Sequence, residues 1–285
     1  MKAIKVIEPF KVEIVDVPKP EIKNSKDVIV RITSGGICGS DIGIYNGTNS
    51  LATYPRLIGH EFGGIVTEIG SEVTSVKVGD KVAVDPVVSC GHCYACKIGR
   101  HNVCSTLEVM GVHRDGGFAE YVSVPAWNLI ALPDNVTYEQ AAMMEPMAVA
   151  VHAMRSALAG AVDCAKSIAV CGLGTIGMLL VLFLREAGYE NIYVLGNKEF
   201  QRSMAAAIGV EPRHIYHGDP GSACEWLFAQ TDGVGVDVFL ECVGKNETIS
   251  DAIRCTAPNG VVQLVGNPAS DLLFDQNTYW KILRN

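Results

Sequence analysis

The chain has 285 residues, of which 48% are hydrophobic and 19% charged, and its formal net charge is −8 at pH 7. This balance is typical of a folded globular protein rather than a disordered one, and at about 150 residues per domain it predicts two domains. The acidic balance and the lack of a Lys/Arg cluster argue against a nucleic-acid partner, so a small-molecule partner is favoured.

Residues 1–146 are expected to form a β-rich domain. Residues 1–18 alternate charged and apolar side chains, which predicts a strand pair and provides no apolar signal-peptide core, so the expected compartment is the cytoplasm. Short Val/Ile runs separated by glycines follow at 27–36, 63–73, 77–88 and 116–125. Several short strands with close turns predict an irregular β-barrel or a sandwich-like domain.

Residues 147–285 have a different pattern, in which strands alternate with helices. A helix is predicted at 148–160, strand-turn-helix units at 167–188 and 191–209, strands at 236–244 and 260–266, and a helix at 247–258. This alternation predicts a parallel, doubly wound sheet, and hence an α/β protein.

Residues 167–184 contain no charged residue, which approaches the length of a membrane helix. Three glycines within residues 172–177 favour a buried strand, a turn and the start of a helix instead, so no membrane segment is expected.

The GLGTIG run at residues 172–177 fits G-x-G-x-x-G between a strand and a helix, which favours a dinucleotide-binding turn over a ligand-free glycine turn. Such a turn needs its first glycine for the tight bend, its second for close approach of a pyrophosphate, and its third for packing of helix against strand. The predicted cofactor-binding residues of this run are Gly172, Gly174, Thr175, Ile176 and Gly177.

The end of the second strand of this unit bears on the choice of cofactor. An acidic residue there usually holds the ribose hydroxyls of NAD, but this chain has Gly196, Asn197 and Lys198. Without that carboxylate, Lys198 and Arg202 could pair with a 2′-phosphate, so NADP is favoured. Glu199 keeps NAD as the alternative, and the two cations could also be ordinary surface charges.

Four cysteines between residues 89 and 104 have the spacing C-x2-C-x2-C-x7-C. In a reducing compartment, clustered cysteines favour metal binding over a disulfide framework. Four thiolates with no open position describe a structural zinc, and an iron-sulfur cluster is the alternative. His92 and His101 lie within the same segment and could substitute for a ligand. The predicted zinc ligands are Cys90, Cys93, Cys96 and Cys104.

A second set of possible ligands is dispersed along the chain. Cys38 lies in GICGSD, His60 and Glu61 lie in GHE, and Glu145 precedes a proline. Each alone is more often a packed core residue, but together they suggest a second metal site.

These motifs occur in the same order as in the zinc-dependent medium-chain alcohol dehydrogenase family, which the chain resembles over nearly its whole length. The resemblance rests on CGSD, GHE, the four-cysteine segment, VGD at residues 78–80 and GLGTIG. It implies a GroES-like catalytic domain at residues 1–146 and a Rossmann dinucleotide-binding domain at 147–285. Glu145 followed by a proline resembles the sorbitol and polyol dehydrogenase branch of the family.

The resemblance also implies a reaction, the transfer of a hydride between a secondary alcohol and NADP or NAD (EC 1.1.1.-). Residues 82–104 are similar to L-galactonate and L-idonate dehydrogenases, and residues 264–285 are similar to galactitol-1-phosphate 5-dehydrogenase. The implied substrate is therefore a polyol, sugar acid or sugar phosphate, and the implied assembly is a homodimer or homotetramer.

In that reaction Cys38, His60 and one glutamate would hold a catalytic zinc with an open position. A second carboxylate would make the site anionic and a poorer Lewis acid, so we expect either Glu61 or Glu145 to ligate at one time. Ser40 matches the family position that passes the alcohol proton outward.

Two features depart from the family. Gly43 stands where many ethanol-type relatives have a relay histidine, and the chain stops at KILRN, several dozen residues early. The second departure suggests a truncated C-terminus and a competing function, a catalytically silent zinc- and nucleotide-binding protein. A redox or metal sensor built on the cysteine segment is a third hypothesis.

Overall fold

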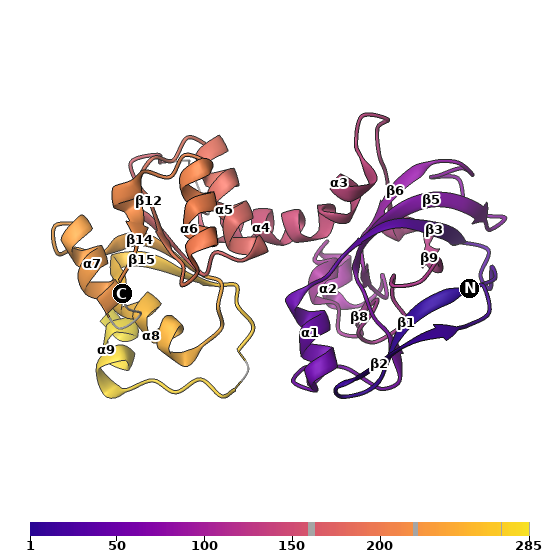
Figure 1. Cartoon of the computed structure of the whole chain (residues 1–285), viewed down its shortest axis with the longest axis horizontal. Helices are drawn as coiled ribbons and strands as arrows, with labels where there is room; N and C mark the ends of the chain where they lie inside the picture. The colour runs from indigo at the N-terminus through magenta and orange to yellow at the C-terminus, as the bar shows by residue number, and fades with distance from the viewer. Residues whose placement is uncertain (159–162, 219–221, 269, 285) are drawn as a thin grey trace. The chain divides into compact units, whose positions relative to one another are not determined.

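A computed structural model describes residues 1–158, 163–218, 222–268 and 270–284 (Figure 1). The chain divides into two compact units, Met1–Glu145 and Pro146–Asn285. The predicted helix at 148–160 is observed as α4, Met144–Ala157, and its last two predicted residues lie outside the described residues.

The first unit is built from antiparallel strands. Its largest sheet has the order β10-β6-β5-β3-β9, a second has the order β2-β1-β4, and β7 pairs with β8. The strands are β1 Lys2–Glu8, β2 Lys11–Asp16, β3 Asp27–Gly36, β4 Arg56–Leu57, β5 Glu61–Ile69, β6 Lys81–Val84, β7 Val87–Val88, β8 Glu108–Val109, β9 Tyr121–Pro125 and β10 Leu129–Ala131. The strand pair predicted for the N-terminus is confirmed by β1 and β2.

Short helices connect these strands. They are α1 Gly39–Asn46, α2 Tyr94–Lys97, η1 His101–Val103, η2 Ala126–Asn128 and α3 Tyr138–Ala142. The core of the sheet consists of valines together with Phe62 and Met110, because alternate residues of each strand point to the same face. Strands β3 and β5 are adjacent, so the loops at their ends lie together.

The second unit contains a five-stranded parallel sheet with the order β13-β12-β11-β14-β15. Its strands are β11 Ile168–Cys171, β12 Ile192–Leu195, β13 Ile215–Tyr216, β14 Val236–Glu241 and β15 Thr256–Leu264. Its other elements are α5 Thr175–Glu186, α6 Glu199–Ala207, η3 Pro212–His214, α7 Ala223–Gln230, α8 Asn246–Cys255 and α9 Gln276–Arg284. The predicted doubly wound α/β class is confirmed.

Helices cover both faces of this sheet (Figure 1). Residues of α4, α5 and α6 pack with Ile168, Val170 and Val194 on one face, whereas α7 and α8 pack with Ala169 and Cys171 on the other. The uncharged stretch at 167–184 is β11, a turn and part of α5. Within the described residues, no helix is both long and apolar enough to cross a membrane.

One predicted boundary in this unit is wrong. Residues 256–258 were expected to continue a helix, but α8 ends at Cys255 and these residues begin β15. Thr256 pairs with Val236 and is buried, so tertiary packing overrides the local helix preference there.

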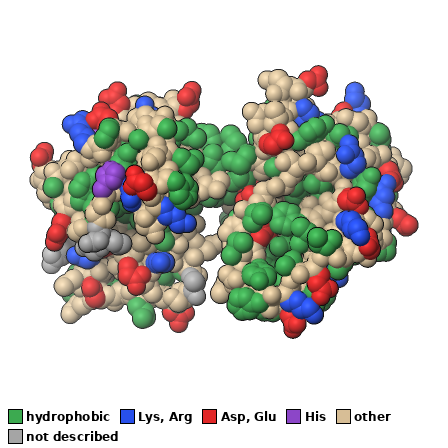
Figure 2. Space-filling model, in the orientation of Figure 1, with side chains coloured by type: hydrophobic (Ala, Val, Ile, Leu, Met, Phe, Trp, Pro, Cys, Tyr) green, Lys and Arg blue, Asp and Glu red, His purple; other side chains and the backbone are tan. Residues whose placement is uncertain are grey.

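Charged side chains of both signs are interspersed over the visible face of each unit, shown in Figure 2.

Candidate functional site

The four predicted structural ligands converge in the loop between β7 and β8. Cys93 caps α2, Cys96 lies within α2, and Cys104 follows η1. The four sulfurs, including that of Cys90, all lie within 4.8 Å of one another, with Cys93 Sγ 3.6 Å from Cys96 Sγ and 3.9 Å from Cys104 Sγ. A tetrahedral zinc with Zn–S bonds of about 2.3 Å needs sulfurs about 3.8 Å apart, so this donor set fits one ion.

Backbone amides around these sulfurs favour the thiolate form. The N–H of Cys90 donates to Cys104 Sγ at 3.3 Å, and that of Cys93 donates to Cys90 Sγ at 3.4 Å. Backbone hydrogen bonds from Cys96 and Ser105 lower the pKa of Cys93 to about 5. Burial instead raises the pKa of Cys96 to about 11, so the loop does not favour four negative charges without a cation.

The two histidines of this segment lie outside the convergent set. His92 is exposed and its Nδ1 lies 2.8 Å from the carbonyl oxygen of Cys90. His101 is also exposed, and its Nδ1 lies 3.3 Å from Ser89 Oγ. The four cysteines therefore complete the donor set without a histidine.

The dispersed residues converge at the ends of β3 and β5. Cys38 lies just beyond β3 as the N-cap of α1, while Glu61 is the first residue of β5. Ligand atoms of Cys38, His60 and Glu61 all lie within 4.8 Å of one another. His60 and Glu61 are 6% and 7% exposed, so two of the three convergent polar side chains are buried.

A glycine makes room for the Glu61 carboxylate. Strand pairing sets Gly36 opposite Glu61, and a Cβ atom on Gly36 would lie 2.3 Å from Glu61 Oε2. Any side chain at this position would therefore displace the carboxylate from the cluster.

Asp41 is a site residue that the sequence analysis missed. It is 1% exposed, and its Oδ2 accepts the N–H of Cys38 at 2.9 Å while its Oδ1 accepts the N–H of Gly59 at 3.3 Å. Oδ1 also lies 3.5 Å from His60 Nδ1, which has no hydrogen-bond partner within the described part of the chain. Asp41 thereby holds the backbone of one predicted ligand and lies beside the imidazole of another.

These contacts set the charge state of the cluster. Burial disfavours the imidazolium, but interactions with Asp41 and Cys38 outweigh burial and raise the pKa of His60 to about 10. The cluster thus has a strongly negative environment that favours a cation. His60 Nε2 lies 3.2 Å from Ser40 Oγ, so the predicted proton-passing hydroxyl is adjacent to the predicted ligand.

Glu145 lies near this cluster but outside the convergent set. It is half-buried near the start of α4, and its pKa is raised by burial, while His60 opposes that shift and Glu61 adds to it. Burial also raises the pKa of Glu61. The Glu61 carboxylate therefore adds to the effect of burial in disfavouring ionisation of Glu145.

The glycine-rich turn after β11 has the geometry that a dinucleotide requires. Gly172 has φ +95°, and a Cβ on Gly177 would lie 1.9 Å from the carbonyl oxygen of Gly172. Gly174 is the N-cap of α5, and a Cβ there would have no atom within 4 Å. The helix therefore starts with open backbone, followed by Thr175 and Ile176, where a phosphate can approach.

The residues after β12 only partly match the expectation for a 2′-phosphate site. Asn197 and Lys198 are exposed. Arg202, however, donates from Nη2 to Glu199 Oε2 at 2.7 Å and from Nη1 to the carbonyl oxygen of Gly196 at 2.9 Å. Arg202 is therefore already engaged, and Lys198 is the better placed of the two predicted cations.

One pair of cysteines departs from the expectation of unpaired thiols. Cys224 of α7 and Cys255 of α8 form a disulfide with a Cα–Cα distance of 5.3 Å. Both residues are buried where the two helices pack on the sheet. This proximity depends on tertiary packing between residues 31 positions apart, so the sequence did not reveal it.

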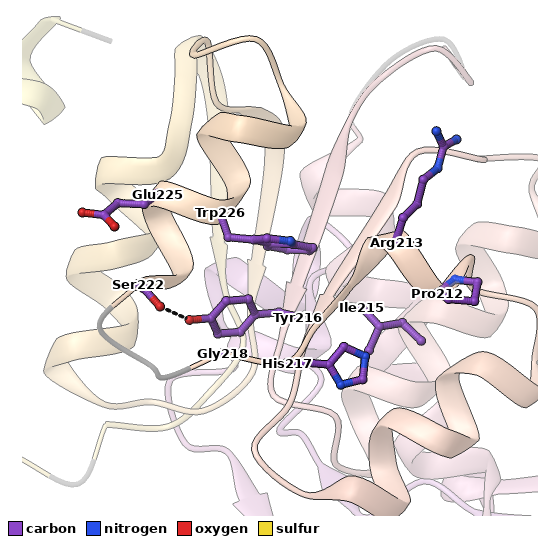
Figure 3. A pocket seen from close by; sticks show the side chains of 9 residues that line it. All are labelled: Pro212, Arg213, Ile215, Tyr216, His217, Gly218, Ser222, Glu225 and Trp226. Carbon is purple, nitrogen blue, oxygen red and sulfur yellow. Dashed lines mark hydrogen bonds between the residues drawn. The ribbon is translucent and has the colours of Figure 1, made fainter.

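A pocket of about 520 Å³ opens beside β13 and α7 in the second unit (Figure 3). The ring of Trp226 lies over Tyr216, with centroids 5.3 Å apart, and the hydroxyl of Tyr216 contacts Ser222. The predicted site residues are not among those that line it.

The first unit is β-rich and contains two clusters of metal-binding side chains. The second unit contains a parallel sheet with a dinucleotide turn. This combination is the architecture of a two-domain dehydrogenase. Comparison with known proteins agrees. The alcohol dehydrogenase GroES-like domain family matches residues 24–134, and the zinc-binding dehydrogenase family matches residues 175–283.

Two curated relatives extend this match along the chain. An uncharacterized zinc-type alcohol dehydrogenase-like protein of Haemophilus influenzae is 38% identical over 272 residues, which cover 95% of this chain and 78% of the relative. An L-threonine 3-dehydrogenase of Pyrococcus furiosus is 36% identical over 88% of this chain and 71% of its own length. The chain belongs to the zinc-dependent medium-chain alcohol dehydrogenase family.

Solved structures show the same fold. Galactitol-1-phosphate dehydrogenase from Escherichia coli is 30% identical with a TM-score of 0.90, over 100% of this chain and 80% of that one. An E. coli alcohol dehydrogenase, RspB, in complex with NADH is 33% identical with a TM-score of 0.86, over 99% and 81%. A zinc-binding dehydrogenase from Sinorhizobium meliloti bound to NADP is 31% identical with a TM-score of 0.85, over 99% and 81%. These matches give no support to a catalytically silent protein.

Proposed function

We propose that this chain is a zinc-dependent, nicotinamide-linked dehydrogenase that interconverts a secondary alcohol of a polyol, sugar acid or sugar phosphate with its ketone. The observation that carries this proposal is the convergence of Cys38, His60 and Glu61 ligand atoms within 4.8 Å of one another. The same chain contains a dinucleotide turn, and it is similar to a galactitol-1-phosphate dehydrogenase.

Cys38 and His60 would hold the catalytic zinc together with one glutamate, and we assign Glu61 as that glutamate because it lies within the convergent set. Cys38 and one carboxylate neutralise a divalent ion, which keeps it a good Lewis acid. Glu145 then orients the substrate hydroxyl, since its raised pKa disfavours a second negative charge beside Glu61. Cys90, Cys93, Cys96 and Cys104 would hold the structural zinc.

When bound, zinc would supply a Lewis acid that lowers the pKa of the alcohol, and the nicotinamide would supply the hydride acceptor. The chain's own residues supply position and a proton path. Asp41 fixes the His60 ring, and Ser40 Oγ, 3.2 Å from His60 Nε2, receives the proton of the substrate hydroxyl. Because Gly43 has no side chain to continue a relay, the proton passes from Ser40 to solvent.

The experiment that tests the function measures turnover and metal content together. Purified protein should contain two zinc ions per chain and reduce NADP or NAD with at least one of sorbitol, L-idonate, L-galactonate and galactitol 1-phosphate. L-threonine belongs in the same panel as a second candidate substrate, because an L-threonine 3-dehydrogenase is 36% identical to this chain. Zinc-loaded protein that turns over L-threonine alone would exclude the polyol proposal, and one that turns over none of the panel would exclude both.

For the cofactor we propose NADP, because Gly196 places no carboxylate at the end of β12 and Lys198 is exposed beside it. Gly196→Asp should shift the NADP to NAD preference toward NAD, by at least about tenfold as expected for a carboxylate close to a 2′-phosphate. Gly196→Asn is the matched control, since its Cβ meets the same Leu173 side chain but adds no charge. Equal preferences in the two variants would contradict the proposal.

A further inference from the structure

Glu241, the last residue of β14, is a fully buried acid with neutral hydrogen-bond donors. Its exposed fraction is 0%. Oε1 accepts the N–H of Val243 at 2.9 Å, and both carboxylate oxygens accept the N–H of Gly244 at 3.0 Å. The hydroxyl of Thr248 lies 2.8 Å from Oε1. Its carboxylate is thus satisfied by the turn that follows its own strand and by Thr248 of α8.

Burying a carboxylate is costly, and stability of the sheet does not require one at this position. Strands β11 and β12 of the same parallel sheet end in Cys171 and Leu195 and reach the same edge without an acid. What Glu241 supplies beyond packing is a fixed conformation for the turn at residues 242–245, because two backbone N–H groups of that turn and the hydroxyl of Thr248 in α8 converge on one carboxylate.

This turn lies between two other loops at the carboxyl edge of the sheet. A Cβ on Gly172 would lie 2.7 Å from Val243 Cγ2, so Val243 packs against the dinucleotide turn. On the other side, a Cβ on Gly266 would lie 2.2 Å from the backbone nitrogen of Gly244. The backbone oxygen of Glu241 also accepts the N–H of Gly266 at 2.9 Å, so this one residue connects all three loops.

The position of these loops identifies which half of a dinucleotide they serve. In a doubly wound sheet the ligand lies across the carboxyl edge where the strand order reverses, which here falls between β11 and β14. The adenosine ribose belongs at the end of β12, where Gly196 lies, so the nicotinamide half belongs over β14 and β15. Val243 is 38% exposed at that edge, as a residue lining a ligand crevice would be.

We propose that Glu241 is a positioning residue for the nicotinamide half of the cofactor. It holds the 242–245 turn against Gly172 and Gly266, and thereby shapes the wall on which the nicotinamide ribose and ring rest. This inference rests on the proposed function, since it requires a dinucleotide at the edge of this sheet.

The test compares ligands that contain the nicotinamide with ligands that lack it. Glu241→Gln keeps the shape of the side chain but turns an amide group, which carries its own N–H donors, toward the amides of Val243 and Gly244. The affinity for NADPH or NADH should fall about tenfold, as expected from losing one charge-assisted hydrogen bond that orders the turn. Affinity for 2′,5′-ADP or AMP should change less than twofold, because these probes contact the β12 side only.

The matched control is Glu247→Gln, which removes an exposed carboxylate from α8, the helix that follows the turn, and should leave the affinity for all four probes unchanged. If Glu241→Gln does not fold, Thr248→Val provides the second test. That change removes one hydroxyl donor while the carboxylate stays, and it should weaken NADPH or NADH binding about threefold. The same hydroxyl accepts the N–H of Lys245 at the start of α8, so the melting temperature should also fall, while the affinity for 2′,5′-ADP or AMP stays unchanged.

The outcomes separate the two proposals. Wild-type protein that binds none of the probes would refute the dinucleotide function itself. If the wild-type protein binds the probes, two results would overturn the role of Glu241 while leaving the function intact. In the first, the variants lose affinity equally for dinucleotides and mononucleotides. In the second, they lose affinity for neither. A loss confined to the nicotinamide-containing ligands supports the proposal.

Discussion

Asp41→Asn provides a direct test of how the catalytic cluster is held together. The carboxylate is 1% exposed and accepts backbone N–H groups of Cys38 and Gly59 on its two oxygens. An amide of the same shape has only one acceptor oxygen, so its NH2 group must face one of these donors. A buried donor left without an acceptor costs about 1–3 kcal/mol, or roughly 2–5 °C of melting temperature for a protein of this size.

The effect on metal binding should be larger than the effect on folding. Loss of a residue that orients a metal-binding histidine typically costs about 10–100-fold in metal affinity or activity. Asp41 is not among the residues that contact the four cysteines, so one zinc per chain should dissociate more readily while the other stays bound.

The assay is release of zinc to a colorimetric chelator, followed in parallel with a thermal melt. The matched control is Asp80→Asn, because Asp80 accepts a backbone N–H from Lys77 in an exposed loop away from the cluster. If Asp41→Asn released zinc no faster than Asp80→Asn, Asp41 would not be the residue that orients His60.

Two further predictions concern the division of labour between the metal sites and the behaviour with pH. Cys38→Ser should abolish turnover with little change in melting temperature, whereas Cys93→Ser should first lower the melting temperature; equal destabilisation of the two variants would contradict separate roles. Burial and the nearby Arg213 lower the pKa of His214 in the folded chain. The unfolded chain therefore protonates this histidine at a higher pH than the folded chain does. Because of that difference, the free energy of unfolding should fall as pH drops below about 6.5. The difference in melting temperature between wild type and His214→Phe should therefore change between pH 7 and pH 5, and a constant difference would show that His214 does not titrate in this range.

The sequence predicted those features that depend on short, local patterns. The strand-turn-helix around Gly172 was predicted because hydrophobic runs and glycines specify it within about 20 residues. The four-cysteine loop was recognisable for the same reason, since its ligands lie within one segment. Strand β13 and helices α7 and α9 were not predicted. β13 is only two residues long, so its strand character comes from pairing with β12.

Asp41 and Glu241 were missed for a different physical reason. Both are acids whose importance lies in complete burial and in the backbone donors they face, and neither property is visible in a linear pattern. A signal was available for Asp41, which follows the predicted ligand Cys38 by three positions at the start of a helix, where a side chain can accept a hydrogen bond from the N-cap. For Glu241 the chain offers no comparable sign.

Strand register explains why the catalytic cluster is less evident in the sequence than the cysteine loop. Cys38 and Glu61 meet because β3 and β5 pair with Gly36 opposite Glu61, and a slip of one residue would turn the Glu61 side chain to the other face of the sheet. The register alone is insufficient, since any side chain larger than hydrogen at position 36 would occupy the space of the Glu61 carboxylate. The convergence of the ligands therefore depends on a residue that contributes no ligand atom. A search for ligand-type residues alone cannot find such a position, whereas the paired strands identify it directly.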